Sequence, residues 1–261
     1  MDGLSRIEFS LQTPGTDEEV QAQIAHALGL GLPEVDTGGK QLHIVANGPT
    51  AVGFFDRPQF GDTMALNGAL GLFTDRNRAP TFWAACDPQE GLVSFLGVAP
   101  KATAYLVASK CHPAVFERLR RHDVRLWHVT DHPVPGKRQV PCAVSITTTV
   151  AILAHRMGYR RLDFWGWDCC FSGKTLDDVG EHHAGKGDLS TTPDAIEMEI
   201  DGAEEHYISN ATWACETTDA SRVLPVLRWC GTDVAIHGRS FISACIADFA
   251  AAPEPELEVA A

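Results

Sequence analysis

The sequence predicts an α/β protein of the Rossmann-like class, with a mainly parallel sheet flanked by helices, a long polar loop and a C-terminal β-hairpin. Three observations support this. Short runs rich in β-branched and aromatic residues recur from residue 41 onward, helical patterns lie between several of them, and polar or glycine-containing turns end them. Strands that alternate with helices are typical of βαβ units, whose strands run parallel.

The chain has 261 residues, of which 44% are hydrophobic. This is enough for one sizeable domain with an ordinary core. We divide it into a helical lead-in over residues 1–40, a single Rossmann-like nucleotide-binding domain over 41–250 and an acidic tail over 251–261. The tail is rich in glutamate and interrupted by proline, so we expect it to be disordered.

The lead-in contains one predicted helix, residues 16–30, where Thr16 and Glu19 have the spacing of a capping box and Gly29 favours an end. Six β-rich runs follow: LHIVA, TMALN, TFWAAC, TAYLVAS, VRLWHVT and RLDFWGW. Helical patterns cover residues 113–122 and 145–158, and Gly158 is placed to close the second of these before a strand.

Residues 169–194 are polar, rich in glycine and histidine, and without periodicity, which is typical of a functional lid or of disorder. After them, Asp201-Gly202 lies between two alternating runs and predicts a β-hairpin. A helix near residues 220–230, a strand at 233–238 and a helix near 240–249 complete the predicted domain.

Charge and composition exclude several classes of function. The formal net charge of −13 argues against a nucleic-acid surface or an anionic membrane surface, because those surfaces need clustered Lys and Arg. No apolar run approaches the roughly 20 residues that span a bilayer, and the N-terminus has no secretory pattern. The eight cysteines form no C-x-x-C pair, so we expect reduced thiols in a cytoplasmic protein and no zinc cluster.

The stretch Ala46-Asn47-Gly48-Pro49-Thr50 interrupts the first predicted core strand abruptly. Gly48 lets the backbone approach a ligand, and Pro49 suits the first position of a helix, whose free N–H groups favour an anion. Asn47 and Thr50 add polar side chains. The alternatives are a phosphate-binding loop and a plain strand-ending turn, and the motif by itself does not separate them.

Polar residues also follow other predicted strands. Asn67 ends the second, Asp87 follows the third and Asp168 follows the sixth. Ligands bind at the carboxyl edge of open α/β sheets, so these side chains are candidates for a nucleotide pocket, and Asp87 and Asp168 for a magnesium site. Each is also an ordinary turn or capping residue.

Two further segments carry candidate chemistry. Ser145, Thr147 and Thr148 open the clearest helix and offer hydroxyl donors to a phosphate or ribose, although helix capping alone calls for one such residue. His182 and His183 lie in the polar loop, where a histidine can serve as a general acid or base. The alternative is that this loop is simply a solvated surface segment.

The sequence resembles the MptE-like family, which is named for archaeal 6-hydroxymethylpterin diphosphokinase. The resemblance lies in the order of six motifs: IVANGPT, ALN, CDP, the Ser/Thr-rich helix start, FWGWD and the histidine loop. The same order is similar to bacterial sialyltransferases. The resemblance implies that Asn47, Gly48 and Pro49 cradle nucleotide phosphates. It also places Asn67, Asp87 and the 145–148 turn near the nucleotide, matches Asp168 to an acidic motif residue, and matches His183 or His182 to the transferase histidine.

Three departures from this pattern bear on the nucleotide: Ala46 in place of glycine, Thr50 in place of serine, and no glycines in SITTTV. The resemblance implies a magnesium-dependent diphosphokinase that moves pyrophosphate from ATP to a hydroxymethyl, pterin-like acceptor. The alternatives are a glycosyltransferase with a nucleotide-activated sugar and a loop histidine as base, and a nucleotide-binding module without catalysis. In each case the expected partners are small molecules.

Overall fold

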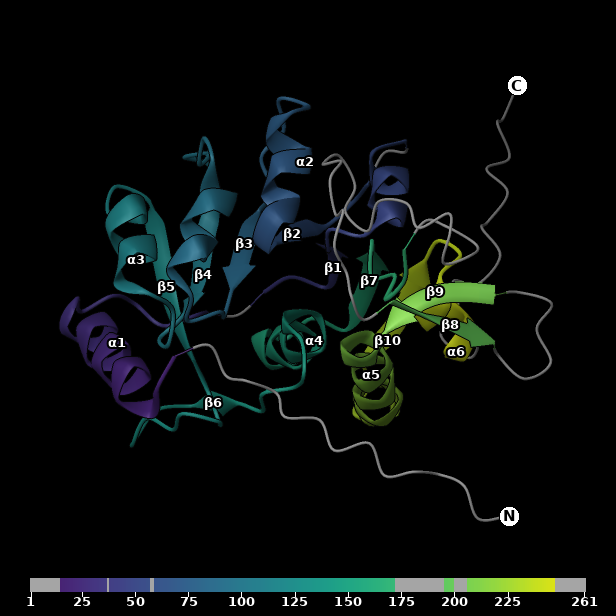
Figure 1. The fold of residues 1–261 in the computed structure, drawn as a ribbon. Helices are drawn as coiled ribbons and strands as arrows, with labels where there is room; N and C mark the ends of the chain where they lie inside the picture. The colour runs from purple at the N-terminus through teal and green to yellow at the C-terminus, as the bar shows by residue number, and fades with distance from the viewer. Residues whose placement is uncertain (1–14, 37, 57–58, 172–194, 200–205, 247–261) are drawn as a thin grey trace, which may run out of the picture.

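The computed structural model describes residues 15–36, 38–56, 59–171, 195–199 and 206–246 (Figure 1). The predicted acidic tail, residues 172–194 of the predicted polar loop and the predicted turn at Asp201-Gly202 lie outside these residues. Residues 169–171, the start of the predicted polar loop, are described and are buried. Within the described part no helix is both long and apolar enough to cross a bilayer.

The predicted parallel sheet is confirmed. Eight strands are ordered β10-β7-β1-β2-β3-β4-β5-β6, and every neighbouring pair runs parallel. Their bounds are β1 (Gln41–Val45), β2 (Asp62–Leu66), β3 (Phe82–Ala85), β4 (Ala104–Ala108), β5 (Asp123–Val129), β6 (Gln139–Val140), β7 (Arg161–Trp165) and β10 (Asp233–His237). All residues of β3 and β4 are buried, as expected of strands covered on both faces.

The strand order reverses at β1. From β1 the chain builds outward on one side to β6, and it then returns to place β7 on the other side of β1, followed by β10. Such a reversal opens a crevice beyond the carboxyl ends of the two strands, and this is where open α/β sheets bind ligands. The loops after β1 and β7 are therefore the ones that this topology brings together.

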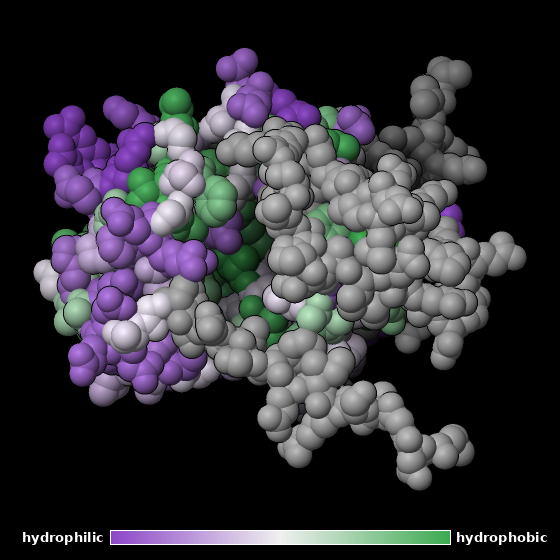
Figure 2. All heavy atoms as spheres, viewed as in Figure 1, coloured by the Kyte–Doolittle hydropathy of each residue, from purple (hydrophilic) through white to green (hydrophobic). Residues whose placement is uncertain are grey.

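The helices form two groups, α2 and α3 on one side of the sheet and α4 and α5 on the other (Figure 1). The α-helices are α1 (Asp17–Gly29), α2 (Leu70–Thr74), α3 (Pro113–Leu119), α4 (Ile146–Met157), α5 (Ala211–Trp229) and α6 (Phe241–Cys245). The 3₁₀ helices are η1 (Pro49–Asp56), η2 (Asn67–Ala69) and η3 (Glu90–Leu96). Over α1 and α3 the visible surface is mostly hydrophilic (Figure 2).

Local signals in the sequence explain several helix ends. Thr16 and Glu19 form the predicted capping box of α1. Gly158 closes α4 in the left-handed conformation with φ of 103°, which glycine adopts without steric cost. Helix α5 begins at Ala211, about nine residues before its predicted start, because the Asn210 side chain accepts from the Trp213 N–H and caps it.

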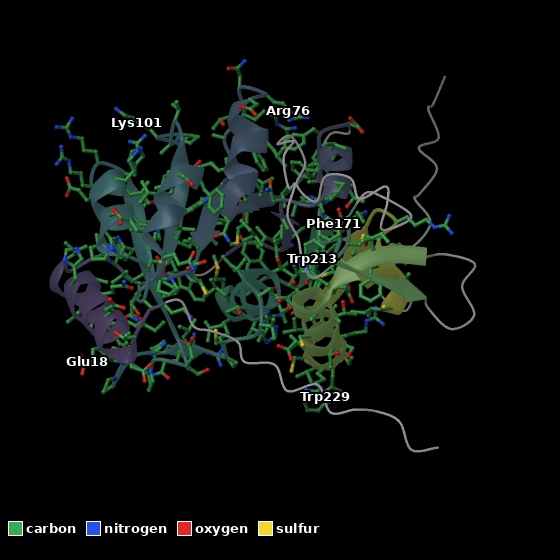
Figure 3. The ribbon with its side chains drawn as sticks, in the orientation of Figure 1. Glu18, Arg76, Lys101, Phe171, Trp213 and Trp229 are labelled. Atoms are coloured by element: carbon green, nitrogen blue, oxygen red, sulfur yellow. The ribbon has the colours of Figure 1, made fainter. Side chains whose placement is uncertain are left out.

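Strands β8 (Ala195–Glu199) and β9 (His206–Asn210) pair antiparallel, apart from the main sheet. The segment after β7 is tied to this pair, because the Phe171 N–H donates to the Ile208 carbonyl at 2.8 Å. The Phe171 ring also packs on Trp213 of α5, with ring centroids 4.8 Å apart (Figure 3). The strand pair thus lies next to the carboxyl end of β7.

Candidate functional site

The loops after β1 and β7 are joined by four hydrogen bonds at the switch point. The Gly48 N–H donates to the Gly166 carbonyl at 2.9 Å, and the Gly166 N–H donates to the Thr50 hydroxyl oxygen at 3.2 Å. The Thr50 N–H donates to Oδ2 of Asp168 at 2.8 Å, and the Thr50 hydroxyl donates to Oδ1 of the same carboxylate. The predicted residues Gly48, Thr50 and Asp168 therefore meet in one place.

The two glycines are required by the closeness of these loops. A Cβ on Gly48 would lie 2.4 Å from Oδ2 of Asp168 and 2.6 Å from the Gly166 carbonyl oxygen. Gly166 itself has φ of 69°, and a Cβ there would lie 2.6 Å from the Ala51 Cβ. In this structure the space at Gly48 is taken by the β7 loop, so the glycine serves the packing of two loops on each other.

Asp168 is a buried carboxylate with an altered acidity. Its exposed fraction is 3%. Burial raises the pKa of Asp168 to about 6, and the two hydrogen bonds from Thr50 offset only part of that effect. A carboxyl group that titrates near neutral pH beside a ligand-binding edge is a candidate functional group.

The start of η1 was predicted to offer free N–H groups to a phosphate. Pro49 does begin the helix, although it is a 3₁₀ helix. The Thr50 N–H, however, is already bound to the Asp168 carboxylate. An anionic side chain of the protein thus takes a position that helix starts provide for anions, and a phosphate there would compete with Asp168.

Two asparagines lie beside this junction. Oδ1 of Asn67 is buried and has no hydrogen-bond partner among the described residues. Asn67 has φ of 44°, a left-handed conformation that asparagine tolerates, and its carbonyl accepts from the Trp83 indole at 2.9 Å. The Asn47 amide nitrogen is 3.3 Å from where a Cβ on Gly68 would be, so the ends of β1 and β2 bring the two amides to one edge. A buried oxygen without a donor is unusual in proteins and is a natural acceptor for a ligand.

Asp87 and Asp168 are not brought onto one ion. Their strands, β3 and β7, are three strand spacings apart, roughly 14 Å at about 4.8 Å each. The Asp87 carboxylate instead accepts from the Gln89 N–H at 2.8 Å, as in a turn. The described residues contain no group of three His, Cys, Asp or Glu side chains able to hold a metal. The strand order therefore weighs against a shared magnesium site at Asp87 and Asp168, which stays a prediction.

The hydroxyl of Ser145 has no bonding capacity left for a ligand. It caps α4 by accepting from the N–H groups of Thr147 and Thr148, and it donates to Glu216 of α5. Glu216 also accepts from the Trp167 indole at 2.6 Å. The Thr148 hydroxyl is completely buried and lacks a partner in the described part of the chain. The predicted nucleotide role of Ser145, Thr147 and Thr148 stays a prediction.

We expect Ser145→Ala to lower the free energy of unfolding by about 1–2 kcal/mol, because a helix cap is lost and a buried carboxylate loses a donor. Chemical denaturation measures this change. Ser94→Ala, at an exposed serine that bonds the Gly91 carbonyl, is the matched control. Equal stability of the two variants would contradict the structural role of Ser145.

Sequence reasoning missed a polar cluster on β7 and β10. Asp163, 1% exposed, accepts from His237 Nε2 at 2.9 Å, from Gln41 at 2.9 Å and from Arg161 Nε at 3.1 Å. Burial acts to raise the pKa of Asp163, but these three donors hold it well below its ordinary value. The His237 ring stacks on Trp165 with centroids 3.9 Å apart. The sequence signal that could have found this cluster is the presence of charged residues inside the apolar runs RLDFW and DVAIH.

The predicted catalytic residues His182 and His183 lie outside the described residues.

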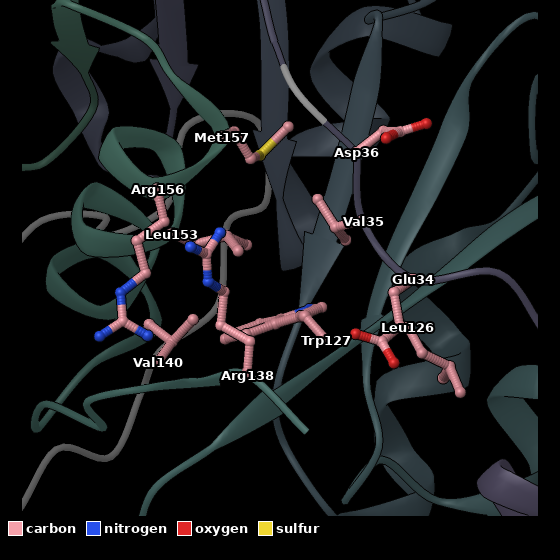
Figure 4. Close-up of a pocket in the computed structure, with 10 residues that line it drawn as sticks. All are labelled: Glu34, Val35, Asp36, Leu126, Trp127, Arg138, Val140, Leu153, Arg156 and Met157. Atoms are coloured by element: carbon pink, nitrogen blue, oxygen red, sulfur yellow. The ribbon is translucent and has the colours of Figure 1, made fainter. Parts of the chain in front are cut away.

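A separate cavity of about 240 Å³ lies between β5, β6 and α4 (Figure 4). Trp127 and Met157 contribute to its apolar lining. Arg138 and Arg156 lie on one side of the cavity, and Glu34 and Asp36 lie on the other side (Figure 4). None of the predicted nucleotide-binding residues lines it. We therefore place the candidate site at the carboxyl edge of β1, β2 and β7.

Comparison with known proteins confirms the fold. The chain is similar in structure to the MAf glycosyltransferase from Magnetospirillum magneticum AMB-1, with a TM-score of 0.56 and 9% sequence identity. The match covers 87% of this chain but 37% of the glycosyltransferase chain. No protein-family model and no curated protein matches the sequence, so membership of the MptE-like family stays a prediction. A structural similarity at 9% sequence identity supports the fold alone, and any activity must be argued from the site.

Proposed function

We propose that the chain is a nucleotide-dependent transferase whose nucleotide lies at the switch point, against Asn47 and Asn67. The observation that carries the proposal is the buried Oδ1 of Asn67, which has no hydrogen-bond partner among the described residues and lies beside the loop that Asp168 holds. This oxygen needs a donor, and the amino group of a base or a ribose hydroxyl would supply one. The position agrees with the ligand edge of open α/β sheets.

Within this class we favour transfer from a nucleotide-activated sugar. The strand order, which sets Asp87 and Asp168 three strands apart, weighs against the two-carboxylate magnesium site on which the diphosphokinase hypothesis relied. The similar fold of a glycosyltransferase adds support. The diphosphokinase remains the second candidate, because the order of sequence motifs resembles that family.

The proposed roles of Asn47, Asn67 and Asp168 rest on their positions in the fold, and the proposed role of the histidine rests on the resemblance to the sialyltransferases. Asn47 and Asn67 hold and orient the nucleotide. Asp168 acts as a positioning residue, because it is 3% exposed and its carboxylate accepts from Thr50. Either His182 or His183 is the proposed base, which takes the proton of the acceptor hydroxyl as its oxygen attacks the sugar. The nucleotide leaves with the bonding electrons.

Thermal unfolding with CMP, UDP, CTP, GTP and ATP, each with and without magnesium, tests this proposal. We expect a nucleotide to raise the melting temperature without magnesium, since a ligand at a hundredfold excess over its Kd adds about 2.7 kcal/mol to stability. Stabilisation by ATP that requires magnesium would favour the diphosphokinase. A melt that no nucleotide shifts would contradict both transferase hypotheses.

The variant Asn67→Gly locates the nucleotide. It removes the side-chain amide but keeps the left-handed backbone and the carbonyl that Trp83 binds. Loss of one ligand hydrogen bond is expected to weaken binding about tenfold, or about 1.4 kcal/mol. The control is Asn77→Gly, at an exposed asparagine with φ of 53°. If both variants bind the nucleotide as well as the parent chain, Asn67 is not part of the pocket.

A further inference from the structure

Four reactive or charged side chains, Cys86, Lys110, Asp131 and Cys142, lie just after the carboxyl ends of β3, β4, β5 and β6. Lys110 donates to Oδ2 of Asp131 at 2.6 Å, and its Nζ lies 3.8 Å from Sγ of Cys142. Cys86 lies close enough to Cys142 for each thiol to shift the pKa of the other. Four separate segments of the chain thus place two thiols and an ammonium group together, outside the candidate nucleotide site.

The ammonium of Lys110 is a permanent feature of this cluster. Lys110 is 6% exposed, and burial by itself lowers its pKa. The net pKa is nevertheless raised above the ordinary value, because negative charge on the Cys86 sulfur, the Asp131 carboxylate and negative charge on the Cys142 sulfur favour the ammonium form. A cation is therefore held beside the sulfur of Cys142 throughout the neutral range.

The two thiols have different surroundings. Cys142 is half-buried, whereas Cys86 is buried. The nearby thiol of Cys86 and then the charge of Lys110 lower the pKa of Cys142, while burial and Asp131 act against this shift. Thiolate character together with access to solvent is what makes a cysteine reactive. Cys142 has both.

We propose that Cys142 is an oxidant-reactive thiol and that Cys86 is its resolving partner. The thiolate of Cys142 attacks hydrogen peroxide, the O–O bond breaks, and water leaves after protonation, so that Cys142 becomes a sulfenic acid. The Cys86 sulfur then attacks the Cys142 sulfur, and the hydroxyl group leaves as water with the Cys86 proton. The peroxide is reduced by two electrons and the two thiols are oxidised to one disulfide.

Limited oxidation of the full chain tests this assignment. After a short exposure to about one equivalent of hydrogen peroxide, remaining thiols are blocked and the peptides are quantified by mass spectrometry. We expect the Cys86–Cys142 disulfide to be the main product, although Cys230 is more exposed. Oxidation of Cys230 at the same rate as Cys142, or a disulfide between other cysteines, would overturn the proposal.

Two variants separate the steps. In Cys86→Ser we expect oxidation to stop at a sulfenic acid on Cys142 that a dimedone probe captures, and in Cys142→Ser we expect no disulfide at Cys86.

Lys110→Gln is expected to slow alkylation of Cys142 about tenfold relative to Cys230, as a one-unit rise in pKa implies. Lys110→Arg keeps the positive charge and is expected to react like the parent chain. An unchanged rate in folded Lys110→Gln would contradict the role of the ammonium. If Lys110→Gln does not fold, limited oxidation of the parent chain still tests whether Cys86 and Cys142 form the disulfide.

Discussion

As the pH rises from below 3.8 to above 6, ionisation of Asp168 is expected to lower the free energy of unfolding of the parent chain by about 3 kcal/mol. Replacing Asp168 with asparagine is expected to abolish this decrease. The folded pKa of about 6 lies above the ordinary value of 3.8. A carboxyl group with a raised folded pKa contributes stability that is complete below the unfolded pKa and is lost as the pH rises through the folded pKa. About 2.2 units at 1.36 kcal/mol each give the expected size.

The measurement is urea unfolding of the parent chain and Asp168→Asn at pH 4, 5, 6 and 7. Other titrating groups are common to both proteins, so the difference between them isolates Asp168. We expect that difference to move in favour of the variant as the pH rises from 4 to 7. Asp75→Asn, at an exposed carboxylate after α2, controls for loss of a surface charge. A difference that stays constant with pH would show that Asp168 is not the desolvated acid that its burial implies.

This result would also bear on function. A buried charge that lowers stability at neutral pH is typical of sites where activity and stability conflict. If the Thr50 loop reorganises around a nucleotide, Asp168→Asn is expected to alter the pH dependence of nucleotide binding as well as its strength. A purely structural role would change stability and leave that pH dependence as it is in the parent chain.

The second large effect is expected at Gly48. In Gly48→Ala the new methyl group would overlap Oδ2 of Asp168 at 2.4 Å and the Gly166 carbonyl at 2.6 Å. Because one of these atoms is backbone, the two loops must separate, and we expect a loss of about 3 kcal/mol in the free energy of unfolding.

Gly71→Ala is the matched control. A Cβ on Gly71, in α2, meets nothing within 4 Å, so alanine there is expected to be neutral or to stabilise by up to about 1 kcal/mol. Denaturation of both variants and the parent chain gives the comparison. Equal stability of Gly48→Ala and the parent would mean that the loops after β1 and β7 are not packed as described. The nucleotide screen on folded Gly48→Ala then tests whether the junction also positions the ligand.

The sequence by itself determined the elements whose signals are local. Alternating β-rich runs and helical patterns predicted the main strands and helices, and Thr16, Glu19 and Gly158 predicted helix ends that the structure has. These predictions succeed because a cap or a buried strand depends on residues within a few positions of each other. The carboxyl-edge location of Asn47, Asn67 and Asp168 followed from the same parallel-strand pattern.

Only the tertiary structure decided which of these residues meet. Thr50 and Asp168 are 118 positions apart, and their contact exists because β7 returns to the side of β1 away from β2. The same strand order separates Asp87 from Asp168, which the sequence pattern had grouped on one ion. The tertiary structure also brings the Ser145 hydroxyl to Glu216, 71 positions away, to which it donates a hydrogen bond. Strand order is set by the packing of distant segments on one core, and no local residue pattern encodes that choice.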